Sequence, residues 1–469
     1  MKKKNIAIIG GGSTGSVAAW ALSKVHNVTI FEKEAVLGGH AYTDVLQLEK
    51  TSLTLDLAVE YFSEKQAPNL CQLLEHFGIK TYVAPLSFGA CFEHTEKDYW
   101  SNTHIKGATW DKIKEECSRF HYQMNTIMHS YNEETKKLTL GQFLEREGYS
   151  RDFIYKALLP LLTTFSSSNS PILEYSLTFC AISFTMGLLS FFHPTYWRKS
   201  SNGITGYLTK IYELLGNNIK LNAPVKKIIR NSKEVIVVIE GNESLSFDEV
   251  IFATHADVTL SLIEDPTELE KQILSKFEYT NIECILHSDP SYYVKEFGRD
   301  VYCYYVSKSK KDFSGSLTRI ENYLDPHKDL TKEVFITFDP KFKIEEKYIY
   351  NKKYWKIPKL RPKDMLNKQK IRYIQGKNRT WFCGTDTSLT GHEGAIVSGL
   401  VIADMLGGKY PFRKNNWAKV QFDIVKSIMG VYSNSEILSN RLNSTIHFIA
   451  KKLGLHKSQI SKVFLDFYV

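Results

Sequence analysis

A cluster of glycines between an apolar strand and an apolar helix constrains the fold of this chain more than any other feature. Residues 5–9 (NIAII) are rich in β-branched side chains, and Gly10, Gly12 and Gly15 follow at once, ahead of a helical pattern. In this spacing the first glycine permits a tight turn, the second lets backbone amides approach a pyrophosphate, and the third allows close helix–strand packing. The helix N-terminus then faces the phosphates. The cluster therefore predicts a βαβ unit that binds a dinucleotide.

The following strand ends in an acidic residue. Residues 27–31 (NVTIF) are predicted to form the second parallel strand, and Glu32 comes directly after it. A carboxylate about 20 residues beyond the glycines accepts hydrogen bonds from a ribose hydroxyl in such units. The alternative interpretation of Glu32 is a solvated strand end. These features alone do not distinguish NAD from FAD.

A second glycine segment lies near residue 390. Residues 380–387 (TWFCGTDT) are predicted to form a strand and a turn. Residues 391–399 (GHEGAIVSG) open an apolar helix that extends to about Leu406. The segment therefore repeats the order of strand, glycine loop and helix.

The choice of cofactor comes from a resemblance. Residues 31–43 (FEKEAVLGGHAYT) resemble the glycine-doublet signature of the flavin amine oxidase, phytoene desaturase and protoporphyrinogen oxidase superfamily. In that superfamily the doublet, here Gly38 and Gly39, packs on the FAD diphosphate. Most members carry arginine after the doublet, where this chain has His40.

Three further segments resemble the same superfamily. Residues 380–399 resemble its closing FAD motif, whose helix faces the flavin ring, and Asp386 takes the place of the acidic residue that faces the ribityl or phosphate region. Residues 221–228 resemble the strand that contacts adenine, and residues 247–255 resemble the return strand. The resemblance implies FAD, and it implies noncovalent binding because the covalent cysteine of some relatives lies in a different context from Cys383. The implied cofactor contacts are Gly10, Gly12, Ser13, Thr14, Gly15, Glu32, Lys33, Gly38, Gly39, His40, Ala58, Val225, Ala253, Gly384, Asp386, Glu393, Gly394 and Ala395.

The expected fold class is α/β. We expect a Rossmann-like FAD-binding domain of the glutathione-reductase type, amine-oxidase-like, with an interleaved α+β substrate domain and a helical C-terminal tail. The expected boundaries are 1–90, 200–262 and 370–408 for the FAD-binding domain, 91–199 and 263–369 for the substrate domain, and 409–469 for the tail. No second GxGxxG motif follows for a nicotinamide cofactor, which favours reoxidation by dioxygen or another acceptor.

A narrower resemblance concerns the substrate. Nearly the whole chain to Gly408 resembles bacterial FAD oxidoreductases that are associated with cyclopropane-fatty-acid synthases. This implies hydride transfer to flavin N5 from an acyl or polyene chain, in a desaturase, oxidase or isomerase reaction of lipid metabolism. Residues 172–196 and 302–305 offer apolar and aromatic lining for such a ligand, although hydrophobic core is the alternative. Residues 172–192 are predicted to form a buried helix rather than a membrane span.

Two other hypotheses for the function remain: a flavin amine oxidase, and a non-catalytic FAD-binding partner of a lipid-modifying enzyme.

Three residues are candidates for catalysis. His392 lies in the loop that should border the flavin, where imidazole can exchange a proton, although a structural hydrogen bond explains it equally well. Glu60 follows an apolar stretch at a position where relatives have no acid, and a surface strand residue is the alternative. Tyr196, between His193 and Trp197, is expected near the substrate site, although a turn at the neighbouring proline explains these residues too.

Composition sets the remaining expectations. The seven cysteines are scattered and form no CxxC pair, so we expect no metal site and a reducing, cytoplasmic location. The net charge is +9, and residues 409–469 carry ten Lys and Arg against three Asp and Glu, a surplus of seven. Leu442, Ile446, Ile449 and Leu453 recur at helical spacing in this tail. A basic amphipathic tail favours peripheral contact with the inner face of a membrane, and a packed cap or a homodimer interface is the alternative. No nucleic-acid partner is expected.

Overall fold

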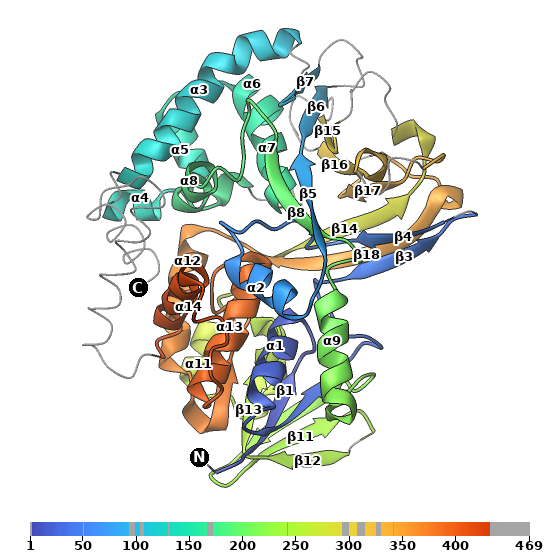
Figure 1. The fold of residues 1–469 in the computed structure, drawn as a ribbon. Coiled ribbons are helices and arrows are strands. Elements are labelled where there is room, and N and C mark those ends of the chain that lie inside the picture. The colour runs from blue at the N-terminus through green and yellow to red at the C-terminus, as the bar shows by residue number, and fades with distance from the viewer. Residues whose placement is uncertain are drawn as a thin grey trace.

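The computed structural model describes residues 2–49, 51–92, 99–103, 107–129, 132–166, 172–241, 243–292, 300–306, 315–324, 330–340 and 342–431. Two domains are built from alternating parts of the chain (Figure 1). One contains a parallel sheet and is called here the parallel-sheet domain. The other contains a seven-stranded mixed sheet and a group of helices and is called here the mixed-sheet domain.

The parallel sheet confirms the predicted α/β class. Its five strands run in the order β19-β13-β1-β2-β9, and all of their pairings are parallel. The side chains of residues 6–9 are all buried, as in a sheet covered by helices on both faces. The strand bounds are Asn5–Ile9 for β1, Asn27–Phe31 for β2, Ile219–Lys220 for β9, Glu249–Phe252 for β13 and Thr380–Phe382 for β19.

Helices α1 (Ser13–Leu22) and α13 (Gly391–Met405) open directly from the two glycine segments. A Cβ at Gly399 would lie 2.5 Å from the Thr14 carbonyl oxygen, so a glycine is needed where these helices cross. Helices α2 (Pro68–His76), α9 (Gly206–Leu215) and α14 (Asn416–Ile428) complete this hydrophobic cluster. Helix α14 falls within the predicted tail, so the described part of that segment contributes to the core. Residues 432–469, with the predicted amphipathic pattern, lie outside the described residues.

The opposite side of the parallel sheet packs against a three-stranded antiparallel unit and two helices. This unit comprises β10 (Val225–Arg230), β11 (Val235–Ile239) and β12 (Ser244–Phe247). Helices α10 (Ala256–Leu262) and α11 (Glu268–Leu274) contribute to the same hydrophobic cluster.

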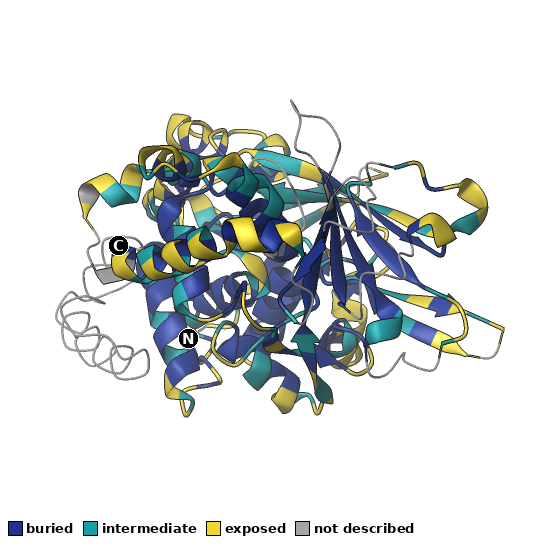
Figure 2. Ribbon diagram, turned by 90° about the horizontal axis from the view of Figure 1, so that it is seen from above, coloured by how far each residue is buried: buried dark blue, intermediate teal, exposed yellow. Residues whose placement is uncertain are grey.

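The mixed-sheet domain has the strand order β18-β14-β17-β16-β15-β6-β7. Its pairings are antiparallel except for β15 with β6. In the view from above, buried residues concentrate in the strands and on the inward sides of helices (Figure 2). The strand bounds are Phe88–Phe92 for β6, Tyr99–Ser101 for β7, Tyr279–His287 for β14, Tyr302–Val306 for β15, Gly315–Ile320 for β16, Phe335–Phe338 for β17 and Ile349–Pro358 for β18.

Two antiparallel strand pairs lie between the domains. They join β3 (Thr43–Gln47) to β4 (Ser52–Asp56), and β5 (Thr81–Leu86) to β8 (Thr195–Ser200).

The helical group covers one side of the mixed sheet (Figure 1). It comprises α3 (Ala108–His129), α4 (Glu133–Lys137), α5 (Leu140–Arg146), α6 (Arg151–Phe153), the π-helical turn η1 (Ile154–Leu158), α7 (Leu159–Ser166), the short turn η2 (Ile172–Glu174) and α8 (Leu177–Thr185). Helix α12 (Pro362–Lys368) connects back to the parallel-sheet domain.

The buried helix predicted over residues 172–192 is present as α8 (Leu177–Thr185), but it is shorter than predicted. Helix α8 ends at Thr185, and Gly187 with a φ of +67° turns the chain away, a conformation that glycine adopts without steric cost. Among the described residues, no helix combines the length and the apolar character needed to cross a membrane.

Candidate functional site

A single cavity of about 1080 Å³ extends from the glycine loops into the mixed-sheet domain. Single-ligand pockets typically measure about 300–1000 Å³, so this volume is at the upper limit for one ligand. Residues from both glycine segments line one part of it. A second part, called here the apolar arm, is lined by Leu86, Phe179, Ile182, Met186, Leu188, Leu189, Ile282 and Phe338.

The first glycine loop has the backbone shape that its sequence predicts. Gly10 adopts a φ of +101°, and a Cβ there would lie 2.9 Å from the Ala253 carbonyl oxygen. A Cβ at Gly15 would lie 2.0 Å from the Gly10 carbonyl oxygen, so this glycine allows α1 to approach β1. Gly10 and Gly12 line the cavity together with Ser13 and Thr14. The loop therefore presents backbone to the cavity, as a phosphate-binding turn requires.

Glu32 is buried and supports this turn. Its carboxylate accepts hydrogen bonds from the Gly11 amide at 2.6 Å and the Glu34 amide at 2.9 Å. Glu32 also lines the cavity, which rules out a solvated strand end. The next residue, Lys33, lines the cavity with a side chain that is 74% exposed.

The glycine doublet lies against the first loop. The Gly38 amide donates to the Gly11 carbonyl oxygen at 3.1 Å, and Gly12 and Gly38 form a parallel bridge. Gly39 has a φ of +59°, and a Cβ on it would lie 3.3 Å from the Gly12 Cα. Side chains larger than hydrogen would therefore separate the two segments that line this part of the cavity.

His40 supplies a neutral ring after the doublet. Its ring centroid lies 5.6 Å from that of His255 and 5.4 Å from that of Trp355. Burial, together with nearby His255, lowers the pKa of His40 to about 4. At neutral pH this position therefore carries no positive charge.

The second glycine loop places a carboxylate at the cavity. Gly384 adopts a φ of +123°, and a Cβ there would meet no atom within 4 Å. Asp386 Oδ2 accepts hydrogen bonds from the Ala256 amide at 2.9 Å and the Tyr279 hydroxyl at 2.6 Å. Its other oxygen, Oδ1, is buried without a hydrogen-bond partner among the described residues. Burial alone would raise the pKa of Asp386, but His255 and these hydrogen bonds hold it below its usual value.

Glu393 and His392, at the start of α13, bind other helices. The Glu393 carboxylate accepts hydrogen bonds from the Asn69 amide and the Leu70 amide, both at 2.9 Å, and so caps α2. Burial raises the pKa of Glu393 to about 7. His392 Nε2 lies 2.8 Å from the Tyr207 hydroxyl and 3.1 Å from the Ser13 hydroxyl.

Burial lowers the pKa of His392 to about 3, so the ring stays neutral. The ring lines the cavity, and its hydrogen bonds hold the N-termini of α1 and α13 together. This geometry favours the structural alternative for His392.

Glu60 lies at the cavity wall within a buried cluster of charges. Its carboxylate accepts hydrogen bonds from Lys199 Nζ at 2.8 Å and from the Tyr302 hydroxyl, and it forms an ion pair with the Arg319 guanidinium. Burial alone would lower the pKa of Lys199, but Glu321 and other neighbours raise it, so Lys199 stays protonated. Glu60 is therefore a fixed anion held by two cations and not a surface residue.

Tyr196 is not in the site. Its side chain is 72% exposed and does not line the cavity, whereas the next residue, Trp197, is buried and does. Successive residues of a strand point to opposite faces, so β8 can present only one of the two to the cavity. His193 also lies outside the cavity lining.

The remaining predicted contacts divide into lining and packing residues. Ala58, Val225, Ala253 and Ala395 line the cavity. Gly394 does not, but a Cβ on it would lie 1.8 Å from the Leu389 carbonyl oxygen, so it allows the loop to close on α13.

Sequence reasoning missed Lys199 and Arg319, which meet Glu60 from distant positions in the chain. The sequence shows Lys199 directly after Arg198 in β8 and Arg319 as one basic residue in β16, and neither pattern reveals the partner.

These features fit FAD. The two glycine loops and the doublet leave a backbone-lined cradle, the unpartnered Asp386 Oδ1 offers an acceptor beside it, and the cavity has room for a large cofactor. Cys383 is buried outside the cavity lining, and burial raises the pKa of its thiol. A buried thiol of this kind is unreactive, which fits noncovalent binding.

Comparisons with known proteins agree with this geometry. The family model described as flavin containing amine oxidoreductase matches residues 14–288, more than half of the chain. No curated protein sequence matches the chain. Cyclohexylamine oxidase from Brevibacterium oxydans IH-35A has a TM-score of 0.65 at 14% identity, over 86% of this chain and 100% of that chain.

Two further solved structures have the same fold. Putrescine oxidase bound to putrescine has a TM-score of 0.62 at 14% identity, over 87% of this chain and 100% of that chain. A CLA-producing fatty acid isomerase from P. acnes has a TM-score of 0.59 at 15% identity, over 87% and 98% of the two chains. From the family match and the cofactor cavity we conclude that the chain belongs to the flavin-containing amine oxidoreductases, with FAD as its cofactor.

Proposed function

We propose that this protein oxidises or isomerises a hydrophobic acyl or polyene chain. The observation that carries the proposal is the apolar arm, which continues from the FAD cradle without interruption. FAD, when bound, supplies a hydride acceptor at N5. The arm's side chains exclude water and hold an extended hydrocarbon beside the flavin site, which lowers the entropic cost of reaching a reactive geometry.

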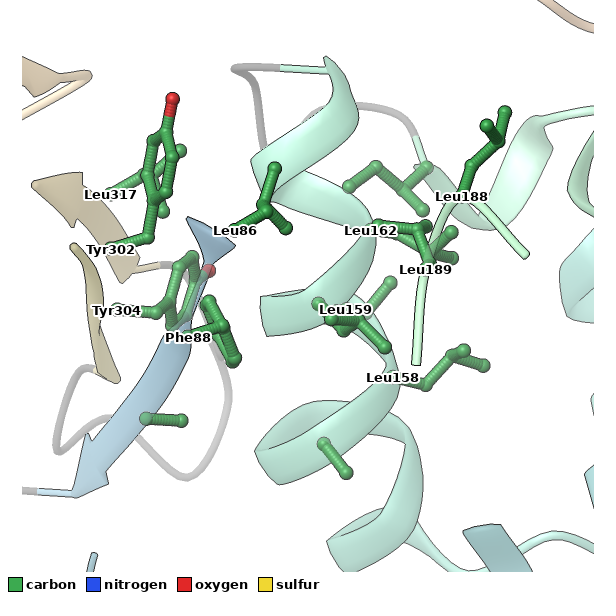
Figure 3. Close-up of a cluster of buried hydrophobic side chains, with 14 of the residues drawn as sticks. Leu86, Phe88, Leu158, Leu159, Leu162, Leu188, Leu189, Tyr302, Tyr304 and Leu317 are labelled. Atoms are coloured by element: carbon green, nitrogen blue, oxygen red, sulfur yellow. The ribbon is translucent and has the colours of Figure 1, made fainter. Parts of the chain in front are cut away.

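The inner surface of the arm is formed by tightly packed side chains. Leu86, Leu188, Leu189 and Tyr302 line the cavity, and they belong to the same cluster of buried side chains as Leu158 (Figure 3). Burial of apolar surface is worth about 25 cal/mol per Å², so a long hydrocarbon gains affinity from this wall without a charged group. Such a surface favours a fatty acyl chain over a small polar substrate.

The charge cluster beside the arm argues against an ammonium group. Glu60 is a carboxylate at this wall, and Lys199 and Arg319 already neutralise it. An alkylammonium would therefore meet a cluster that has no unpaired negative charge at Glu60. Burial raises the pKa of Tyr302 well above its usual value, so its hydroxyl stays protonated and donates to Glu60.

Oxidation of a hydrophobic amine is the second candidate. It is favoured by the family description and by the similar folds of cyclohexylamine oxidase and putrescine oxidase. The similar fold of the fatty acid isomerase supports the acyl alternative. Chains of matched length with carboxylate, methyl ester or amine ends separate the two candidates.

The experiment incubates the reconstituted holoprotein with these chains and analyses products by mass spectrometry and chromatography. Dehydrogenation removes two hydrogens, and isomerisation changes retention at constant mass. We expect products from the unsaturated acid or ester, and none from the Ile182→Trp variant, whose side chain fills the arm. The matched control, Tyr196→Phe, changes an exposed residue and should retain activity. Turnover of the amine alone would contradict the proposal.

Peripheral membrane contact through the basic C-terminal segment also belongs to this proposal. Because α14 is part of the core, the informative truncation ends at Val431 and removes residues 432–469. We expect this truncation to reduce sedimentation with anionic liposomes and to leave FAD content unchanged. Equal sedimentation of the two proteins would contradict membrane contact through this segment.

A further inference from the structure

A buried lysine lies behind the second glycine loop. Lys368, the last residue of α12, is 3% exposed. Its Nζ donates hydrogen bonds to the carbonyl oxygens of Thr385 at 2.6 Å and Ser388 at 3.1 Å. The loop residues Thr385, Asp386 and Leu389 line the cavity, whereas Lys368 does not. The ammonium therefore supports the loop from the side that faces away from the cavity.

Peptide geometry then fixes the direction of two amides. In a trans peptide the carbonyl of one residue and the N–H of the next point in opposite directions within one plane. The Thr385 and Ser388 carbonyls face Lys368, so the Asp386 and Leu389 amides face the opposite way, toward the cavity. Neither amide donates a hydrogen bond to a described residue. Two donors are thus left for a ligand in the FAD cradle.

The position of Lys368 is costly for folding. Burial lowers the pKa of Lys368 to about 8, although Asp386 and Asp364 act in the opposite direction. Taking an ammonium out of water is unfavourable, and the hydrogen bonds to the two carbonyl oxygens offset only part of this cost.

We propose that Lys368 is a positioning residue for the cofactor. It holds the loop so that the Asp386 and Leu389 amides donate to an oxygen acceptor of FAD, and its positive charge favours the electron-rich reduced cofactor. Aligned amide dipoles of this kind bind anionic and electron-rich groups without reorganisation. The inference rests on FAD as the cofactor and does not depend on which substrate is oxidised.

The test compares Lys368→Met with Lys370→Met, a control two residues away on an exposed side chain. Lys368→Met should raise the Kd for FAD, measured by flavin fluorescence on the apoprotein, by roughly tenfold or more, since hydrogen bonds from charged groups are strong. It should also make the reduction potential of the bound flavin more negative. Lys370→Met should leave the Kd for FAD within twofold of the wild-type value and the reduction potential unchanged. The shift in reduction potential separates positioning of the cofactor from a purely structural role, which would leave the potential unchanged. Equal Kd and potential in wild type and Lys368→Met would overturn the proposal.

A second measurement uses the wild-type protein alone. Addition of FAD should slow hydrogen exchange of the amides in residues 384–391, because the Asp386 and Leu389 amides gain acceptors. Unchanged exchange of that segment on saturation with FAD would overturn the proposal even if Lys368→Met failed to fold.

Discussion

His392 stays neutral at physiological pH because burial lowers its pKa to about 3, and it shares its Nε2 with Ser13 and Tyr207. His40 is neutral for the same reason, with a pKa of about 4. The buried hydroxyl of Tyr302 keeps its proton. At the scale of residues, burial therefore fixes the protonation states of these three side chains across the neutral pH range. The chemistry of the site then depends mainly on the cofactor and on orientation of the substrate.

Glu60 gives a stability prediction at this scale. Glu60→Gln removes the anion that pairs with Lys199 and Arg319, and Arg319 keeps its ion pair with buried Glu321. Breaking a buried ion pair in this way typically costs about 3–5 kcal/mol. We expect the free energy of unfolding in urea to fall by about that amount. The double variant Glu60→Gln/Lys199→Met should recover part of the loss. Equal stability of Glu60→Gln and wild type would show that the cluster is solvated.

Glu393 gives a pH prediction. Its pKa rises from the usual 4.5 to about 7 in the folded protein, mainly because of burial. The folded state therefore binds this proton more tightly than the unfolded chain. Its contribution to the free energy of unfolding should be fully present below about pH 4.5 and lost as the pH rises to about 7. The shift corresponds to about 3 kcal/mol. Urea titrations across this range should show the decline in wild type and a flatter profile in Glu393→Gln. Identical slopes would contradict the assignment.

At the scale of elements, close contact between α1 and β1 depends on Gly15. An added Cβ would lie 2.0 Å from the Gly10 carbonyl oxygen, which is backbone and cannot move aside cheaply. Gly15→Ala should therefore displace the first glycine loop and abolish FAD retention during purification. Gly206→Ala, in α9, meets only the flexible end of Ile79 at 3.2 Å and should retain FAD. Loss of flavin absorbance in both variants, or in neither, would contradict the role assigned to Gly15 in shaping the first glycine loop.

The local elements could be predicted from the sequence because each carries its own signal. The strands at residues 5–9 and 27–31 and the helix that begins at residue 391 match β1, β2 and α13. The end of the helix expected over residues 172–192 could not be predicted, because apolar composition does not reveal the turn at Gly187. The prediction that Tyr196 lies near the substrate site was wrong for a related reason. The pairing of β8 with β5 decides which face of β8 is buried. These strands are far apart in the sequence, so their pairing depends on tertiary structure.

At the scale of the whole molecule, the cavity is an interface between two domains. Glu60 contacts Lys199 and Arg319, which lie far from it in the sequence and on different strands. Such clusters form only when the chain is folded, so the FAD cradle was predictable from contiguous motifs and the substrate wall was not. The cofactor site is thus identified by its family, and the substrate site is inferred from packing and charge.

The most direct test of this account is anaerobic mixing of the FAD-loaded protein with unsaturated long-chain acids and amines of matched length, followed by visible absorbance. We predict bleaching or perturbation of the flavin bands by the acid or its methyl ester, and weaker or no response to the amine. Bleaching by the amine with no response to any acyl chain would contradict the proposed function.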